Sequence, residues 1–146
     1  MDTSKQYILM CEKAEEIQPL FKCLGDIVSW DNGRVFLVVK CYPDSVNGIR
    51  IKEWENEEEI DLASNATILL PRQDQLQGMV GYSNYTPNKY KNPASDLIKL
   101  VIEFKLEKNK SHYFEHNSME QLWLAFVMKE KYGKIWKGKD WEAINV

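Results

Sequence analysis

Residues 27–39 have the sequence IVSWDNGRVFLVV, two apolar runs on either side of an Asp31-Asn32-Gly33 turn. Val, Ile and aromatic residues favour strands, and an Asn-Gly pair accepts the positive φ angles of tight hairpin turns. The stretch therefore predicts a β-hairpin. Further strands are expected at residues 49–51, after an Asn47-Gly48 turn, and at residues 66–70, which stop at Pro71. Residues 26–70 should thus form a small antiparallel sheet, either a meander or a barrel.

Helices are expected both before and after this sheet in the sequence. Before it, a helix over about residues 4–24 is predicted by apolar residues that recur at steps of three and four, namely Tyr7, Met10, Ala14, Ile17, Phe21 and Leu24. Pro19 should kink or shorten its last turns. After the sheet, Pro71 precedes a short helix at 72–80, and a Ser118/Gln121 capping box opens a helix that ends at Gly133. The sequence therefore predicts a single α+β domain, 1–146.

The rest of the C-terminal half is less regular. Residues 81–95 have turn composition and are expected to form a loop. Residues 97–106 could be a helix, which the caps Ser95 and Asp96 favour, or a strand, which their Ile, Val and Phe favour. Residues 96–146 are expected to be mostly helical, with a tight turn at 137–140 that folds the tail back and leaves one tryptophan on each arm.

Composition places the chain among soluble globular proteins. It has 146 residues, of which 44% are hydrophobic and 28% charged, values close to the average for such domains. The net charge of −3 and the pI near 5.5 argue against nucleic acid as the partner. No apolar run approaches the roughly 20 residues of a membrane span, and the first residues lack a secretion signal. We expect a cytoplasmic protein, with no membrane partner, that could form a homo-oligomer.

Few residues have a pattern typical of catalysis. The three cysteines, Cys11, Cys23 and Cys41, have neither the spacing of a metal or redox pair nor an even number. The chain contains no glycine-rich phosphate loop and no nucleophile-elbow motif. No cofactor is therefore expected, and an enzyme is less expected than a binding protein.

A metal site is the alternative to this interpretation. His112 and His116 are four residues apart, with Glu115 between them, and on one helix both imidazoles would share a face. The zinc-protease pattern places its glutamate directly after the first histidine, where this chain has Tyr113. A small metal-assisted hydrolase thus stays an alternative to histidines that simply lie at the surface.

Two segments offer candidate binding residues. Arg72, Gln73, Asp74 and Gln75 form a polar turn that could present donors and acceptors to a partner, or could simply be the start of a helix. Tyr82 and Tyr85 add aromatic rings in the loop that follows. Near the C-terminus, Trp136, Lys137 and Lys139 combine an indole with positive charge, which could serve weak nucleic-acid binding, although an indole turned inward is the simpler interpretation.

Three segments resemble small phage and prophage proteins of Gram-positive bacteria: YILMCEKAEEIQ at 7–18, LPRQDQLQ at 70–77 and SMEQLWLAFVMKEKYGKIW at 118–136. The resemblance implies an accessory gene of a mobile element and carries no catalytic residues. Such proteins often inhibit host enzymes or host defence. We therefore expect stoichiometric binding of a host or phage macromolecule, with a protein as the partner.

Overall fold

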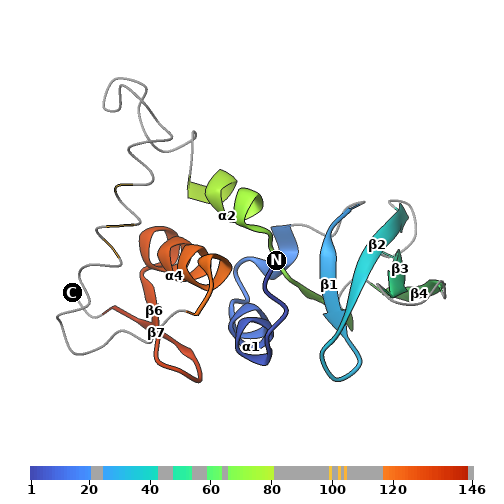
Figure 1. Ribbon diagram of the computed structural model, residues 1–146, viewed down its shortest axis with the longest axis horizontal. Coiled ribbons are helices and arrows are strands. Elements are labelled where there is room, and N and C mark those ends of the chain that lie inside the picture. The colour runs from blue at the N-terminus through green and yellow to red at the C-terminus, as the bar shows by residue number, and fades with distance from the viewer. Residues whose placement is uncertain are drawn as a thin grey trace. The chain divides into compact units, whose positions relative to one another are not determined.

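The computed structural model describes residues 1–20, 25–42, 48–53, 59–63, 66–80, 99, 102, 104 and 117–144. Its architecture is α+β, as predicted, with an N-terminal helix, a five-stranded antiparallel sheet and C-terminal helices (Figure 1). The contacts divide the chain into two compact units: residues 3–71, here the sheet unit, and residues 1–2 with 72–146, here the helical unit. None of the described helices is long and apolar enough to cross a membrane.

The sheet unit is built on a meander. Its strands, in the spatial order β4-β3-β2-β1-β5, are β1 (Ile27–Trp30), β2 (Arg34–Tyr42), β3 (Gly48–Glu53), β4 (Glu59–Ala63) and β5 (Ile68–Leu69). The β1–β2 turn has positive φ angles at Asp31 (48°), Asn32 (62°) and Gly33 (90°). This conformation is the one that the Asn-Gly pair predicts, so the hairpin is confirmed.

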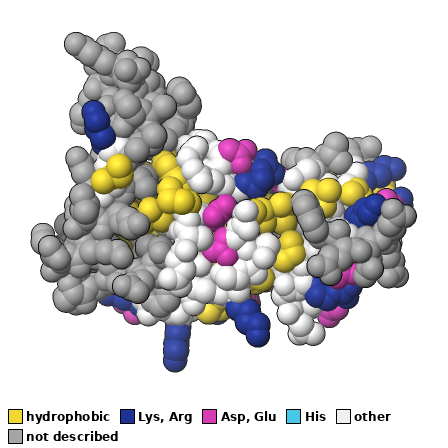
Figure 2. Space-filling view, in the orientation of Figure 1, with side chains coloured by type: hydrophobic (Ala, Val, Ile, Leu, Met, Phe, Trp, Pro, Cys, Tyr) yellow, Lys and Arg dark blue, Asp and Glu magenta, His cyan; other side chains and the backbone are white. Residues whose placement is uncertain are grey.

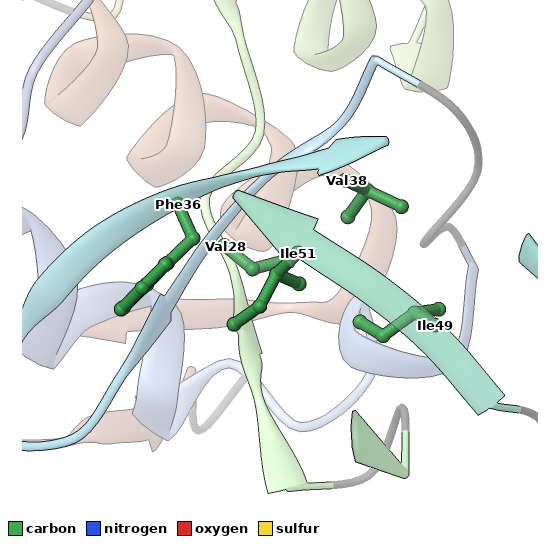
Figure 3. Packing of buried hydrophobic residues seen from close by; sticks show 5 residues of the cluster. All are labelled: Val28, Phe36, Val38, Ile49 and Ile51. Atoms are coloured by element: carbon green, nitrogen blue, oxygen red, sulfur yellow. The ribbon is translucent and has the colours of Figure 1, made fainter. Parts of the chain in front are cut away.

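One face of this sheet forms a hydrophobic core. Five side chains from β1, β2 and β3 cluster on it and are almost fully buried: Val28, Phe36, Val38, Ile49 and Ile51 (Figure 3). Ile60 and Leu62 from β4 pack against the cluster and are partly buried. Because side chains alternate along a strand, the residues between them face the other way.

Helix α1 (Lys5–Lys13) is much shorter than the helix expected over 4–24. It begins at Ser4, whose hydroxyl accepts a hydrogen bond from the Tyr7 N–H at 3.2 Å. It ends at Lys13, and a short 3₁₀ helix, η1 (Gln18–Leu20), follows a turn. Pro19 prevents this helix from running on to residue 24, because in a helix its ring would clash with the carbonyl four residues earlier. The apolar face of Tyr7, Met10, Ala14 and Ile17 is nevertheless buried as predicted; residues 21–24 lie outside the described part.

Gln18 closes the β5 edge of the sheet. Its amide oxygen accepts the Leu69 N–H at 2.8 Å, and its amide nitrogen donates to the Leu69 carbonyl at 3.4 Å. The same nitrogen donates to the Cys11 carbonyl in the last turns of α1 at 2.7 Å. The side chain thus takes the place of a neighbouring strand and joins β5 to α1.

The helical unit centres on α4 (Met119–Tyr132). The predicted cap is present, since the Ser118 hydroxyl accepts the Gln121 N–H at 3.1 Å, and Gly133 ends the helix at a φ of 63°. The Asp2 carboxylate accepts hydrogen bonds from the Ser118 hydroxyl and from the Gln121 amide at 2.8 Å. Gln121 is buried, and every residue from it to Met128 is buried too.

Shorter elements surround α4. Helix α2 (Gln73–Val80), the short helix predicted after Pro71, packs against it and buries Leu76, Met79 and Val80. The described residues of the 97–106 segment, Lys99, Ile102 and Phe104, are helical. Residues up to 146 were expected to be mostly helical. Instead, the described residues that follow α4 form a hairpin of β6 (Lys134–Trp136) and β7 (Trp141–Ala143). Trp136 pairs with Trp141 across it, which confirms the predicted turn.

Candidate interaction surface

A β-bulge sets the chemistry of the second face of the sheet. In the β2–β3 pairing Val38 lies opposite Ile51. Lys40, two residues after Val38, lies opposite Arg50, which is only one residue away from Ile51. Val39 is therefore an extra residue in β2. A bulge of this kind reverses the side-chain alternation beyond it. Lys40 would share the core face with Val38 in a regular strand, and instead it faces away from the core.

The bulge brings Lys40 and Tyr42 onto the same face as the polar residues of β3 and β4. The pairings of Arg50 with Asp61 and of Lys52 with Glu59 place these four residues next to one another on that face. We call this set the charged face: Lys40, Tyr42, Arg50, Lys52, Glu59 and Asp61. Its members are exposed or half-buried, and Figure 2 shows basic and acidic side chains side by side over the sheet unit.

Arg50 lies at the centre of the charged face. Its guanidinium makes two hydrogen bonds to the Asp61 carboxylate, at 2.8 Å from Nε and 2.9 Å from the terminal nitrogen. Its other terminal nitrogen approaches the Glu59 carboxylate at 3.5 Å. The two parallel bonds to Asp61 fix the plane of the guanidinium, which is the geometry that makes arginine selective for carboxylates.

Tyr42 contacts two of the three cations of the face, Lys40 and Arg50. The ammonium of Lys40 lies 4.9 Å from the centre of its ring, and the Arg50 guanidinium carbon lies 6.0 Å from the same centre. The phenol hydroxyl donates to the Asp61 carboxylate at 3.3 Å. An aromatic ring held between cations and bonded at its hydroxyl is already ordered before any partner arrives.

The pKa values of Arg50, Asp61 and Tyr42 are all shifted away from neutral pH. Hydrogen bonding to Asp61 raises the pKa of Arg50, and hydrogen bonding to Arg50 lowers the pKa of Asp61. Partial desolvation raises the pKa of Tyr42. All three groups therefore hold their usual charges at neutral pH, and the face offers fixed charges and donors rather than a group poised to exchange a proton.

The lowered pKa of Asp61 predicts a pH effect. Its contribution to stability is complete above the ordinary aspartate pKa of about 4 and is lost as pH falls through the lower value in the folded state. Asp61→Asn should thus flatten the fall of stability on acidification, measured by chemical denaturation across the acid range. Glu142→Gln, which removes an exposed carboxylate on β7, should leave that fall unchanged. Identical curves for both variants would contradict the prediction.

The opposite face has its own arginine, with a different setting. Arg34 follows the hairpin turn, donates to the Glu53 carboxylate at 2.8 Å and contacts Asp31 at 3.3 Å. Its guanidinium lies 5.3 Å from the ring centre of the buried Phe36. Arg34 therefore covers the edge of the core, whereas Arg50 faces away from it.

The polar turn predicted as a contact site is largely self-paired. Arg72 donates to the Asp74 carboxylate from Nε at 3.1 Å and from a terminal nitrogen at 3.3 Å, and this bond lowers the pKa of Asp74. Gln75 accepts the Arg72 N–H at 2.9 Å, so its amide caps the start of α2. Gln73 is half-buried. The turn thus has a structural role as the start of a helix, and its role in binding stays a prediction.

The C-terminal candidates are divided between interior and surface. Trp136 is buried, with its ring centre 5.0 Å from that of Trp141, as the simpler interpretation of this segment had it. Lys137 and Lys139 are exposed in the turn.

The remaining candidates lie outside the described residues: Tyr82, Tyr85, His112, Glu115 and His116. Among the residues that are described, no group of His, Cys, Asp and Glu side chains has the arrangement of a metal site. Comparison with models of protein families, with curated proteins and with solved structures finds no match for this chain.

Sequence reasoning missed the charged face, although a signal for it exists. Residues 49–52 and 59–62 both alternate charged and apolar residues, with cations in the first segment and carboxylates in the second. Opposite charges on one face of paired strands are a common source of cross-strand attraction. That pattern predicts the pairing of β3 with β4, but no local pattern indicates the bulge at Val39.

Proposed function

We propose that the protein acts by stoichiometric binding of another protein, and that the charged face is its binding surface. The observation that supports this most is the bulge at Val39, which turns Lys40 and Tyr42 away from the core face and toward Arg50. Bulges are common where a strand must re-aim a side chain for function. A regular strand would have left Arg50 without the aromatic ring beside it.

The composition of the charged face fits a protein partner. Tyrosine and arginine are the residues, with tryptophan, that most often carry the binding energy of protein interfaces. Here both are ordered by their contacts with Asp61, so less side-chain freedom is lost when a partner binds. Lys40, Glu59 and Asp61 are exposed around them and provide charges that can select a partner.

The resemblance of three segments to phage and prophage proteins suggests the setting. We propose that the partner is a protein of a Gram-positive host or of its phage, and that binding inhibits a host enzyme or a defence system. A binding protein of this kind needs no catalytic group, because one molecule blocks one target.

Substitutions on the charged face test this proposal. Tyr42→Ala and Lys40→Glu should each weaken binding to a partner captured from a Gram-positive host lysate by about tenfold or more. Lys131→Glu, the same charge change on an exposed residue of the helical unit, should leave the affinity unchanged. Dissociation constants measured by calorimetry on the purified complex decide between these outcomes.

Two results would contradict the proposal. One is a partner that binds all three variants as tightly as the unsubstituted protein, which would place the binding surface elsewhere. The other is the absence of any partner together with turnover of a metabolite or nucleic acid by the purified protein, which would indicate an enzyme.

A further inference from the structure

The two edges of the sheet are not equivalent. At the β5 edge the Gln18 amide bonds both the N–H and the carbonyl of Leu69, so that edge is closed by a side chain. At the other edge β4 is the terminal strand and pairs only with β3 within the described part of the chain. A strand at an edge presents backbone N–H and carbonyl groups to which a further strand can bond.

Charges cross the sheet in two rows that both end at β4. One row runs from Lys40 through Arg50 to Asp61. The other runs through Lys52 to Glu59. Each row therefore has cations inside the sheet and a carboxylate at the edge. A strand added beyond β4 would place its own side chains directly opposite Asp61 and Glu59, where cations would be favoured.

The other side of β4 requires apolar residues. Ile60 and Leu62 are partly buried against the core cluster, and they alternate with Glu59 and Asp61. An added strand with apolar residues at the alternate positions would extend this apolar face, while its cations would extend the charged face. The matching segment thus alternates Lys or Arg with residues such as Val or Ile.

A second copy of this chain fits the edge poorly. If β4 paired with β4 of another copy in antiparallel fashion about Asp61, the two Asp61 carboxylates would lie opposite each other. Pairing about Ile60 would bring Glu59 opposite Asp61, and parallel pairing in register would bring each carboxylate opposite its own copy. Like charges opposite each other destabilise a strand pair, so the edge disfavours self-association and favours a basic partner.

We propose that β4 binds an extended basic segment of the partner protein as an additional strand of the sheet. This inference rests on the proposed function, because it specifies how a partner at the charged face is recognised. Backbone hydrogen bonds would supply affinity that does not depend on sequence, and the two carboxylates would select alternating cations.

The test uses three synthetic peptides with capped ends. The first alternates lysine and valine over seven residues, the second alternates glutamate and valine, and the third is the lysine peptide with alternate backbone nitrogens methylated. The methylated peptide keeps the charge but cannot donate the hydrogen bonds of a strand. Binding is followed by backbone amide chemical shifts of the folded protein, which report both the affinity and the position of the peptide.

The lysine peptide should shift the amides of residues 59–63 and bind at least about tenfold more tightly than either of the others. Glu59→Gln, which removes one edge carboxylate and keeps the Arg50–Asp61 bonds, should weaken binding severalfold, and its melting curve checks that it folds. If the methylated peptide binds as tightly as the lysine peptide, the attraction is due to charge and not to strand pairing. If the chemical shifts change only outside residues 59–63, the peptide binds elsewhere. Either result overturns the inference.

Failure of this inference can be told apart from failure of the proposed function. If no peptide binds, the inference falls, but the function stands when Tyr42→Ala still loses a partner that the unsubstituted protein retains. If the partner binds Tyr42→Ala normally and no peptide binds, both are overturned.

Discussion

Replacing Trp123 by alanine should lower the free energy of unfolding by about 3–5 kcal/mol, the range for truncation of a large buried aromatic side chain. Trp123 is 2% exposed and lies edge-on to Phe126, with ring centres 5.8 Å apart. It sits within the continuously buried part of α4, where surrounding side chains cannot fully collapse into the space it leaves. Urea denaturation of the purified variant measures the effect.

The chemistry of the Trp123 indole provides a matched control. Within the described structure, its N–H has no hydrogen-bond acceptor, so Trp123→Phe loses packing but no hydrogen bond and should cost clearly less than Trp123→Ala.

Arg72→Ala and Asp74→Ala remove an exposed ion pair and should each cost under about 1 kcal/mol. If either destabilises as much as Trp123→Ala, the polar turn is essential scaffolding, and any role in binding would have to be withdrawn.

Gln18→Ala should be the most damaging substitution in the sheet unit outside its apolar core. It leaves the Leu69 N–H without the bond that it has now, and a buried polar group left unpaired costs about 1–3 kcal/mol. The Cys11 carbonyl loses the Gln18 donor but still accepts the Ala14 N–H at 3.2 Å. A loss of about 1–3 kcal/mol is expected, together with faster hydrogen exchange at the Leu69 amide. Gln6→Ala is the control, because the Gln6 amide nitrogen has no hydrogen-bond partner within the described residues.

Gln18→Glu separates the donor from the acceptor. A carboxylate can still accept the Leu69 N–H, but its second oxygen would face two carbonyl oxygens, so the variant should be destabilised at neutral pH. Protonation restores a donor, which raises the pKa of the introduced carboxyl in the folded state above its unfolded value. The deficit should therefore shrink as pH falls through that raised value. A deficit independent of pH would show that the amide nitrogen does not matter.

Elements specified by neighbouring residues could be predicted from the sequence. The β1–β2 hairpin follows from the two apolar runs on either side of Asn32-Gly33, and α4 follows from the Ser118/Gln121 capping box. In each case the signal lies within a few residues of the structure it determines. The burial of Trp136 and Trp141 on the arms of a tight turn belongs to the same class.

Features that depend on distant residues could not be predicted. The periodicity of residues 7–24 indicated one long helix, but Pro19 and the bonds of Gln18 to β5 favour a turn after Lys13. The charged face depends on the register between β2, β3 and β4 and on one extra residue, Val39, which looks like any other strand residue in the sequence. The burial of Gln121 depends on Asp2, a hydrogen-bond partner 119 residues away along the chain.

The order of strands has a consequence for the rate of folding. Strands β1, β2 and β3 each pair with the next strand in the chain, so these contacts close short loops and can form early. Gln18 and Leu69 are 51 residues apart and meet only after a long loop has closed. The contact between them should be absent from the transition state. Its loss should then leave the folding rate nearly unchanged and appear almost wholly as faster unfolding. The Gln18 amide therefore determines the lifetime of the folded sheet rather than the rate at which the sheet forms.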